Sequence, residues 1–218
     1  MFEKRGLFVF PVLLITIVKC QKNILFLVAD DLRPNLGAYN DANADIFKQP
    51  PMYTPNLDSL ASKSLLFEKA YDVFALCNPS RTATLTSRRP DTTRVTRIGP
   101  YWRDYGGNFS TLPQFFKENG YYTVGAGKIF HKGRSSNNDD CQYSWSVCPF
   151  YHAPNNAHPG EKLSWVAFNK TYLDEKPLQD TLNTNYVIDK LKGAAETFKA
   201  GGAPFFISLG IHKPHLPW

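Results

Sequence analysis

"NILFLVADD", residues 23–31, places a short apolar run directly before two aspartates, Asp30 and Asp31. A continuous apolar run of this length is typical of a strand buried on both faces of a parallel sheet. Polar residues that follow such a strand lie at its carboxyl end, where open α/β sheets bind their ligands. This stretch therefore predicts a central strand that brings Asp30 and Asp31 to a functional edge.

Strands and helices alternate along the rest of the chain. Three further apolar stretches predict strands, at residues 65–71, 121–127 and 204–211. Capping residues and helical spacing predict helices that begin near Thr54, Asn78, Thr111 and Asp180, the last one ending at Lys199. Residues 141–177 have little periodicity and are expected to form a long surface excursion. The alternation predicts an α/β fold: a mostly parallel central sheet with helices on both faces.

Reactive side chains fall at the ends of the predicted strands. Cys77 follows the second strand and stands immediately before a predicted helix, Lys128 and His131 follow the third strand, and His212 follows the last. Each of them alone is more often structural or solvated than catalytic. Because the carboxyl ends of parallel strands meet at one edge, we expect these groups and the two aspartates to lie together.

The charge of the chain favours anionic partners. The 218 residues carry a formal net charge of +6. Nucleic acid, a sulfated or phosphorylated substrate, and a merely solvated basic face are all compatible with this charge. Much of the positive charge is concentrated in the arginines just after Cys77: Arg81, Arg88, Arg89, Arg94, Arg97 and Arg103.

The N-terminus indicates the compartment. Residues 1–20 combine two basic residues with an apolar run too short to span a bilayer, which is typical of a secretory signal peptide. Nothing later in the chain predicts stable membrane insertion. Two acceptor triplets, at Asn108 and Asn169, predict N-glycosylation in the secretory pathway.

Four cysteines have to be assigned in this oxidising compartment. Cys141 and Cys148 are close in sequence, so a local disulfide is their most economical pairing. Cys20 lies at the expected cleavage point, which leaves Cys77 without an obvious partner. Cys77 could be a thiol nucleophile, half of a disulfide, or neither.

The residues expected at the sheet edge suit the hydrolysis of a phosphate or sulfate ester. Adjacent carboxylates are hard ligands for Ca²⁺ or Mg²⁺, and the sequence has no cysteine and histidine spacing typical of zinc. Lysine, arginine and histidine can hold a tetrahedral oxyanion, and the positive end of the helix after Cys77 points to the same place. A metal, an anion site and one nucleophile position together indicate this class of hydrolase.

Two short motifs identify a family. CNPSR at 77–81 and LTSR at 85–88 resemble the signature of the sulfatases, although that family usually has glycine in place of Ser87. In sulfatases a formylglycine-generating enzyme oxidises the cysteine to an aldehyde, so the resemblance implies that Cys77 is neither a thiol nor a half-cystine. The resemblance covers nearly the whole mature chain. It is also carried by ADDLRPNLGAY (29–39), RRPDTTR (88–94), GNFSTLPQFFKENGY (107–121), GKIFHKG (127–133) and GIHKPHLPW (210–218).

The resemblance implies an alkaline-phosphatase-like fold and a set of metal ligands. Asp30, Asp31 and the hydrated aldehyde of Cys77 would bind one Ca²⁺ ion, and the hydrate would attack sulfur. Arg81 would orient the hydrate. Residues 21–218 would be the N-terminal part of the catalytic domain, incomplete at the C-terminus, because relatives continue past Trp218 with a further acidic ligand and a further lysine.

The resemblance also implies a substrate and its contacts. Lys128 and His212 would contact the sulfate, and His131 would assist the breakdown of the sulfated enzyme. The implied substrate is the 2-O-sulfated iduronate of heparan or dermatan sulfate, met in the lysosomal lumen or after secretion, with no nucleic-acid partner.

Two other functions remain open from the sequence. One is an inactive secreted protein of the family that binds sulfated glycans. The other is a metal-dependent phosphodiesterase of the same superfamily, which is disfavoured because those enzymes generally have threonine or serine at the position of Cys77.

Overall fold

A computed structural model describes residues 21–39, 52–148, 150–154 and 165–216. The predicted signal peptide, residues 1–20, and the last two residues lie outside the described part. None of the helices in the described part is long and apolar enough to cross a membrane.

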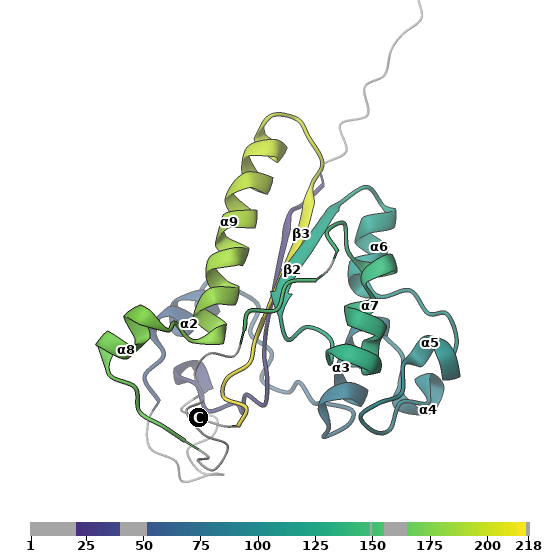
Figure 1. The fold of residues 1–218 in the computed structure, drawn as a ribbon, viewed down its shortest axis with the longest axis horizontal. Helices are drawn as coiled ribbons and strands as arrows, with labels where there is room; N and C mark the ends of the chain where they lie inside the picture. Colours follow the sequence, from purple (N-terminus) through teal and green to yellow (C-terminus); the bar gives the residue numbers. More distant parts are fainter. Residues whose placement is uncertain (1–20, 40–51, 149, 155–164, 217–218) are drawn as a thin grey trace, which may run out of the picture.

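In the described part of the chain the sheet has three strands, all parallel, in the order β1-β3-β2 (Figure 1). They are β1 (Ile24–Ala29), β2 (Tyr122–Gly127) and β3 (Phe205–Ile211). The first and last of these strands are therefore direct neighbours, with Ile24 opposite Phe206. The predicted parallel α/β sheet is confirmed.

Helix α9 (Gln179–Lys199) covers one face of the sheet (Figure 1). It packs on β2 and β3 through a cluster that includes Val124, Val187 and Ile207, each no more than 3% exposed. The helix begins one residue before the predicted Asp180 and ends at the predicted Lys199. The apolar spacing along this helix explains why its position could be read from the sequence.

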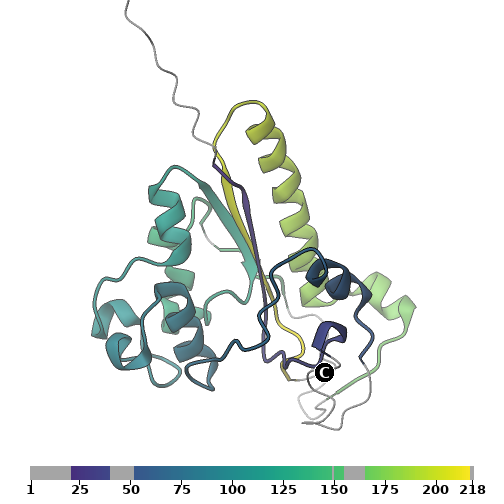
Figure 2. The ribbon, with the colours of Figure 1, turned by 180° about the vertical axis from the view of Figure 1, so that it is seen from behind.

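Short helices cover the opposite face, as the view from behind also shows (Figure 2). Their core is aromatic: Trp102 stacks on Phe130 with ring centroids 5.7 Å apart, and Trp145 meets Phe130 edge-on. Helices on both faces of the sheet agree with the prediction. The helices of this face are α3 (Cys77–Thr86), α4 (Pro90–Thr93), α5 (Trp102–Tyr105), α6 (Leu112–Glu118) and α7 (Asn137–Ser144).

Helix α6 begins at the predicted cap, where Thr111 and Gln114 form a reciprocal capping box.

The remaining elements lie outside these two layers. The helix predicted after Thr54 is α2 (Pro55–Ala61). The others are η1 (Gly37–Tyr39), η2 (Gly133–Ser136) and α8 (Lys170–Glu175).

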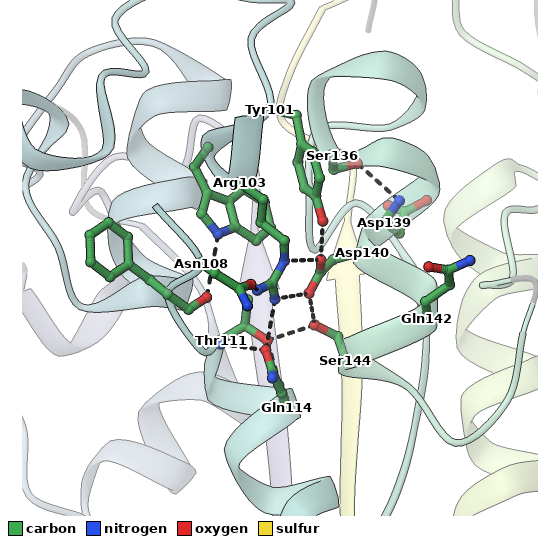
Figure 3. A network of polar contacts seen from close by, with 12 residues as sticks. Tyr101, Arg103, Asn108, Thr111, Gln114, Ser136, Asp139, Asp140, Gln142 and Ser144 are labelled. Atoms are coloured by element: carbon green, nitrogen blue, oxygen red, sulfur yellow. Dashed lines mark hydrogen bonds and ion pairs between the residues drawn. The ribbon is translucent and has the colours of Figure 1, made fainter. Parts of the chain in front are cut away.

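A buried polar network ties α5, α6 and α7 together (Figure 3). The Arg103 guanidinium donates to both oxygens of Asp140, at 2.7 and 2.8 Å, and to Gln114 Oε1 at 2.7 Å. Tyr101 and Ser144 donate hydroxyl hydrogen bonds to the same carboxylate. The Asp140 side chain is fully buried, so these donors replace the water that it loses.

Three expectations about burial and strands are wrong. Residues 65–71 form no strand, because they find no partner strand in the described part and leave Leu65 80% exposed. Strand β1 is partly buried, and on one face only: Phe26 stacks on Phe206, but α9 covers the other two strands and leaves Leu27 53% exposed. The stretch from residue 141 is not wholly on the surface, because Trp145 lies in the core.

Candidate active site

Cys77 is the first residue of α3 and faces the carboxyl end of the sheet. The strand predicted at residues 65–71, directly before it, is absent, and the structure puts Cys77 inside the helix rather than just before it. Asn78 fixes this helix start, since its buried side-chain amide donates to the carbonyl oxygens of Arg97 and Pro100. Cys77 is partly exposed and is a free cysteine among the described residues. It therefore stands where a reactive group can meet a ligand.

Asp30 is held between two cations. Its Oδ1 accepts a hydrogen bond from Arg81 at 2.5 Å, and its Oδ2 accepts one from the Lys128 ammonium. Burial by itself raises the pKa of Asp30, but the hydrogen bonds and charges of Lys128 and Arg81 outweigh it and hold that pKa below its ordinary value. Asp30 is thus a buried, ionised carboxylate.

The Lys128 ammonium joins Asp30 to Cys77. Its Nζ lies 3.6 Å from Cys77 Sγ, and its backbone carbonyl accepts a hydrogen bond from Arg81. Close approach of the backbones allows this: a Cβ on Gly210 would lie 2.1 Å from the carbonyl carbon of Lys128. A glycine is therefore required opposite the end of β2 to position this lysine.

Two histidines from the predicted set border the same place. Burial first, and then the charge of Lys128, lower the pKa of His131, and its Nδ1 is buried with no partner among the described residues. Burial, Lys128 and His215 lower the pKa of His212 to about 4. Both rings therefore bind a proton less readily than a free imidazole does.

The loop after β3 is held by the start of α9. The carboxylate of Asp180 accepts hydrogen bonds from the backbone N–H groups of His212 and Lys213, at 2.8 and 2.9 Å. This contact anchors the loop that carries His212, which lines a cavity together with Cys77. It also brings His215, which was not in the predicted set, into the site.

The carboxylates at the end of β1 could hold a cation. Ligand atoms of Asp30, Cys77 and His215 lie within 4.8 Å of one another. Asp31 is exposed and lies 3.8 Å from His215 through Oδ2 and Nε2. Both aspartates line a cavity of about 670 Å³ in front of Cys77 and Arg81. The structure thus brings every predicted site residue of this edge to one region, and adds His215.

The predicted disulfide and glycosylation residues lie away from this edge. Cys141 and Cys148 are joined in a disulfide with Cα atoms 5.8 Å apart. Asn108 and Asn169 are both exposed. Asn169 caps α8 with its side-chain oxygen, and Asn108 accepts a hydrogen bond from Arg103 through its oxygen, so both leave the amide nitrogen available.

The parallel sheet and the polar residues at its carboxyl end are those expected of a sulfatase, and comparison with known proteins gives the same family. Residues 22–218 match the sequence profile of the sulfatase family, and the chain belongs to that family.

Two similar proteins are both named iduronate 2-sulfatase. The chain is 44% identical over 208 residues to iduronate 2-sulfatase of Homo sapiens and 43% identical to that of Mus musculus, with 90% of this chain covered. It is 29% identical to N-acetylgalactosamine-6-sulfatase of Homo sapiens over 89% of its length. The chain spans about a third of the length of the two iduronate 2-sulfatases, 36% and 35%.

Solved structures share the fold at low sequence identity. A Bacteroides thetaiotaomicron protein from a study of glycosaminoglycan metabolism has a TM-score of 0.58 and 23% identity, over 90% of this chain and 45% of that one. The phosphonate monoester hydrolase of Agrobacterium radiobacter has a TM-score of 0.56 and 22% identity, over 89% and 41%. These likenesses confirm the expected fold class.

Proposed function

We propose that this chain is part of a sulfuric ester hydrolase that removes the 2-O-sulfate from iduronate residues of heparan or dermatan sulfate. The observation that carries the proposal is the Lys128 ammonium, which bridges the buried Asp30 carboxylate and residue 77 in a chain of the sulfatase family. The sugar is taken from the relatives, which are iduronate 2-sulfatases at 43–44% identity.

Residue 77 would be converted from cysteine to formylglycine by the formylglycine-generating enzyme in the endoplasmic reticulum. The hydrated aldehyde would then supply the nucleophile for sulfur, while a bound Ca²⁺ ion would polarise the sulfate. A free, partly exposed Cys77 at the first turn of α3 is compatible with this conversion. The compartment follows from the predicted signal peptide: the secretory pathway, and then the lysosomal lumen or the extracellular space.

The donors at the end of β1 fit Ca²⁺ in kind. Asp30 and Asp31 offer hard carboxylate oxygens, and Ca²⁺ takes six to eight oxygen ligands. Arg81 and Lys128 already bond to both oxygens of Asp30, so a cation would have to share that carboxylate with them. Further ligands have to come from outside this pair of aspartates.

The side chains of this chain would bind and orient the sulfate. Lys128 and His212 border the cavity beside residue 77 and would contact the sulfate oxygens. Arg81 would orient residue 77 from the next turn of α3, since its guanidinium is fixed on the carbonyl oxygens of Lys128 and Ile129. His131 is neutral at pH 7 and its unpartnered Nδ1 could accept a proton during breakdown of the sulfated enzyme.

A second function is an inactive secreted protein that binds sulfated glycans. It is favoured by the two ion pairs of Asp30, which leave this carboxylate little capacity for a metal. Such a protein would retain the basic site and release no sulfate.

The experiment that separates the two functions measures both conversion and turnover. The full natural reading frame is expressed in cells that contain the formylglycine-generating enzyme, with Cys77→Ala as the matched control. We expect the tryptic peptide of residues 70–81 to show the mass of an aldehyde, and the protein to release sulfate from a 4-methylumbelliferyl iduronide 2-sulfate. An unmodified thiol in every such peptide, with no sulfate released, would favour the glycan-binding protein.

A further inference from the structure

A second cavity, of about 340 Å³, opens beside Cys77 toward α9. Lys128, His131 and His212 line it and belong to the site described above. Lys132 and His152 also line it and have no role there so far. Pockets for small ligands begin at about 300 Å³, so the cavity suits a single small group such as one sugar residue.

The cavity is rich in basic side chains and hydrogen-bonding groups. Its lining within the described part of the chain contains two lysines and four histidines, and it contains no aspartate or glutamate. An anionic group would therefore find attraction and no opposing carboxylate on the wall. The sulfate at residue 77 would use only the part of this wall formed by Lys128 and His212.

His152 is held in place by a buried carboxylate. Its Nε2 lies 2.7 Å from Oδ2 of Asp139, whose side chain is 5% exposed. Asp139 is itself fixed, because its N–H donates to Ser136 Oγ and its carbonyl accepts from the Trp145 indole (Figure 3 shows the first contact). Because Nε2 is occupied by Asp139, Nδ1 is the ring atom that remains for a ligand.

A left-handed turn aims this carboxylate. Residues 137–140 all have left-handed backbone angles, with φ between 47 and 60°. Asparagine and aspartate are the residues other than glycine that adopt this conformation most readily. The turn directs Asp139 toward His152 and Asp140 toward Arg103, so the two neighbouring carboxylates serve two different places.

Asn183 of α9 brings an unused donor to the cavity. Its side chain is 1% exposed, and its Oδ1 accepts the backbone N–H of Ala153 at 2.9 Å. This bond fixes which end of the amide carries the oxygen. The Nδ2 group then has no partner among the described residues, and a buried donor left unpaired is unfavourable. A ligand acceptor in the cavity would satisfy it.

We propose that Lys132, His152 and Asn183 form a subsite for the carboxylate of a uronate whose sulfate lies at residue 77. The inference rests on the proposed function and names the second anionic group that the enzyme recognises. Lys132 supplies the charge, the Nδ2 group of Asn183 supplies a fixed donor, and the Nδ1 atom of His152 supplies a further polar contact. A neutral sugar of the same shape would leave Lys132 without a counter-ion at the subsite.

The test compares two ligands that differ only in this group. Methyl 2-O-sulfo-α-L-iduronide and its C6-reduced counterpart, the 2-O-sulfo-idoside, are titrated by isothermal calorimetry into the full natural protein carrying Cys77→Ala, which lacks the proposed nucleophile and so does not consume the ligand. We expect the uronide to bind about tenfold more tightly, as suits one charge-assisted contact. Equal affinities, or no measurable binding of either ligand, would overturn the subsite.

Variants assign the preference to named residues. Lys132 is exposed, so Lys132→Ala should fold normally, lose most of the preference for the uronide and leave the affinity for the idoside unchanged. Lys132→Arg should restore the preference, and His152→Gln should reduce it. Lys199→Ala, at the far end of α9, is the matched control and should change nothing. If Lys132→Ala weakens the binding of both ligands equally, Lys132 does not recognise the carboxylate and the proposal fails.

Sulfate release keeps the two proposals distinguishable. If the protein prefers the uronide in binding but, with Cys77 intact, releases no sulfate from either ligand, the result contradicts the proposed function and agrees with the subsite. If the protein releases sulfate from both ligands with equal affinity and equal kcat/KM, the result agrees with the proposed function and contradicts the subsite.

Discussion

Removing Arg103 should destabilise the protein far more than an ordinary surface substitution. In Arg103→Met the apolar stem is retained while Asp140, whose side chain has no exposure, loses two charge-assisted hydrogen bonds of 2.7 and 2.8 Å. Breaking a buried ion pair by removing one partner costs about 3–5 kcal/mol, because the other charge stays buried. We expect the free energy of unfolding to fall by about that amount.

Urea denaturation, followed by the fluorescence of the buried Trp102 and Trp145, measures this loss. Two controls sharpen it. Arg89→Met removes an exposed ion pair with Asp91 at 3.8 Å and should cost about 0.5 kcal/mol or less. The double variant Arg103→Met, Asp140→Asn should lose less than the sum of its two single changes, because neither charge is then left alone. A loss below about 1 kcal/mol for Arg103→Met, or strict additivity, would refute the reasoning.

Two other predictions concern α3 and the loop after β3. Ser87 ends α3 with a left-handed φ of 54°. Ser87→Gly should therefore raise the free energy of unfolding, measured by urea titration, by about 1 kcal/mol. No gain would show that the serine is unstrained there. The pKa of His212 falls to about 4 in the fold from 6.5. The unfolded chain therefore binds a proton that the native state rejects, and stability present above pH 6.5 is lost as the pH falls toward 4. In buffer with a chelator, the Tm of the natural protein should drop more steeply over this window than that of His212→Asn, and parallel curves would contradict the assignment.

The sequence predicted the elements whose pattern depends on local burial. β3 was predictable because both of its faces are covered, and Ile207 and Leu209 on one face alternate with Phe206 and Ser208 on the other. Residues 65–71 have a similar apolar content and form no strand. Composition alone does not reveal whether a neighbouring strand is available, and a strand without a hydrogen-bonded partner does not form.

The candidate site was predictable where it follows the ends of strands or a family motif. Asp30 and Lys128 come directly after β1 and β2, and Cys77 begins the motif that resembles the sulfatase signature. His215 carried a weak signal, since it stands three residues after His212. His152 and Asn183 carried none, because only the tertiary fold brings an irregular segment and the first part of α9 beside Cys77.

The pairing of the first strand with the last sets an order of events during synthesis. Asn23 and Phe205, which share a hydrogen bond at the start of this pairing, are 182 positions apart. At about 5–20 residues per second the ribosome needs roughly 10–40 s to make the intervening chain. During this time β1 has left the exit tunnel without its only hydrogen-bonded neighbour in the described sheet, and Leu25, Leu27 and Phe26 are uncovered. The nascent chain thus exposes an apolar strand before its partner strand has been made, and protection of that strand becomes a condition of assembling the edge that carries Asp30.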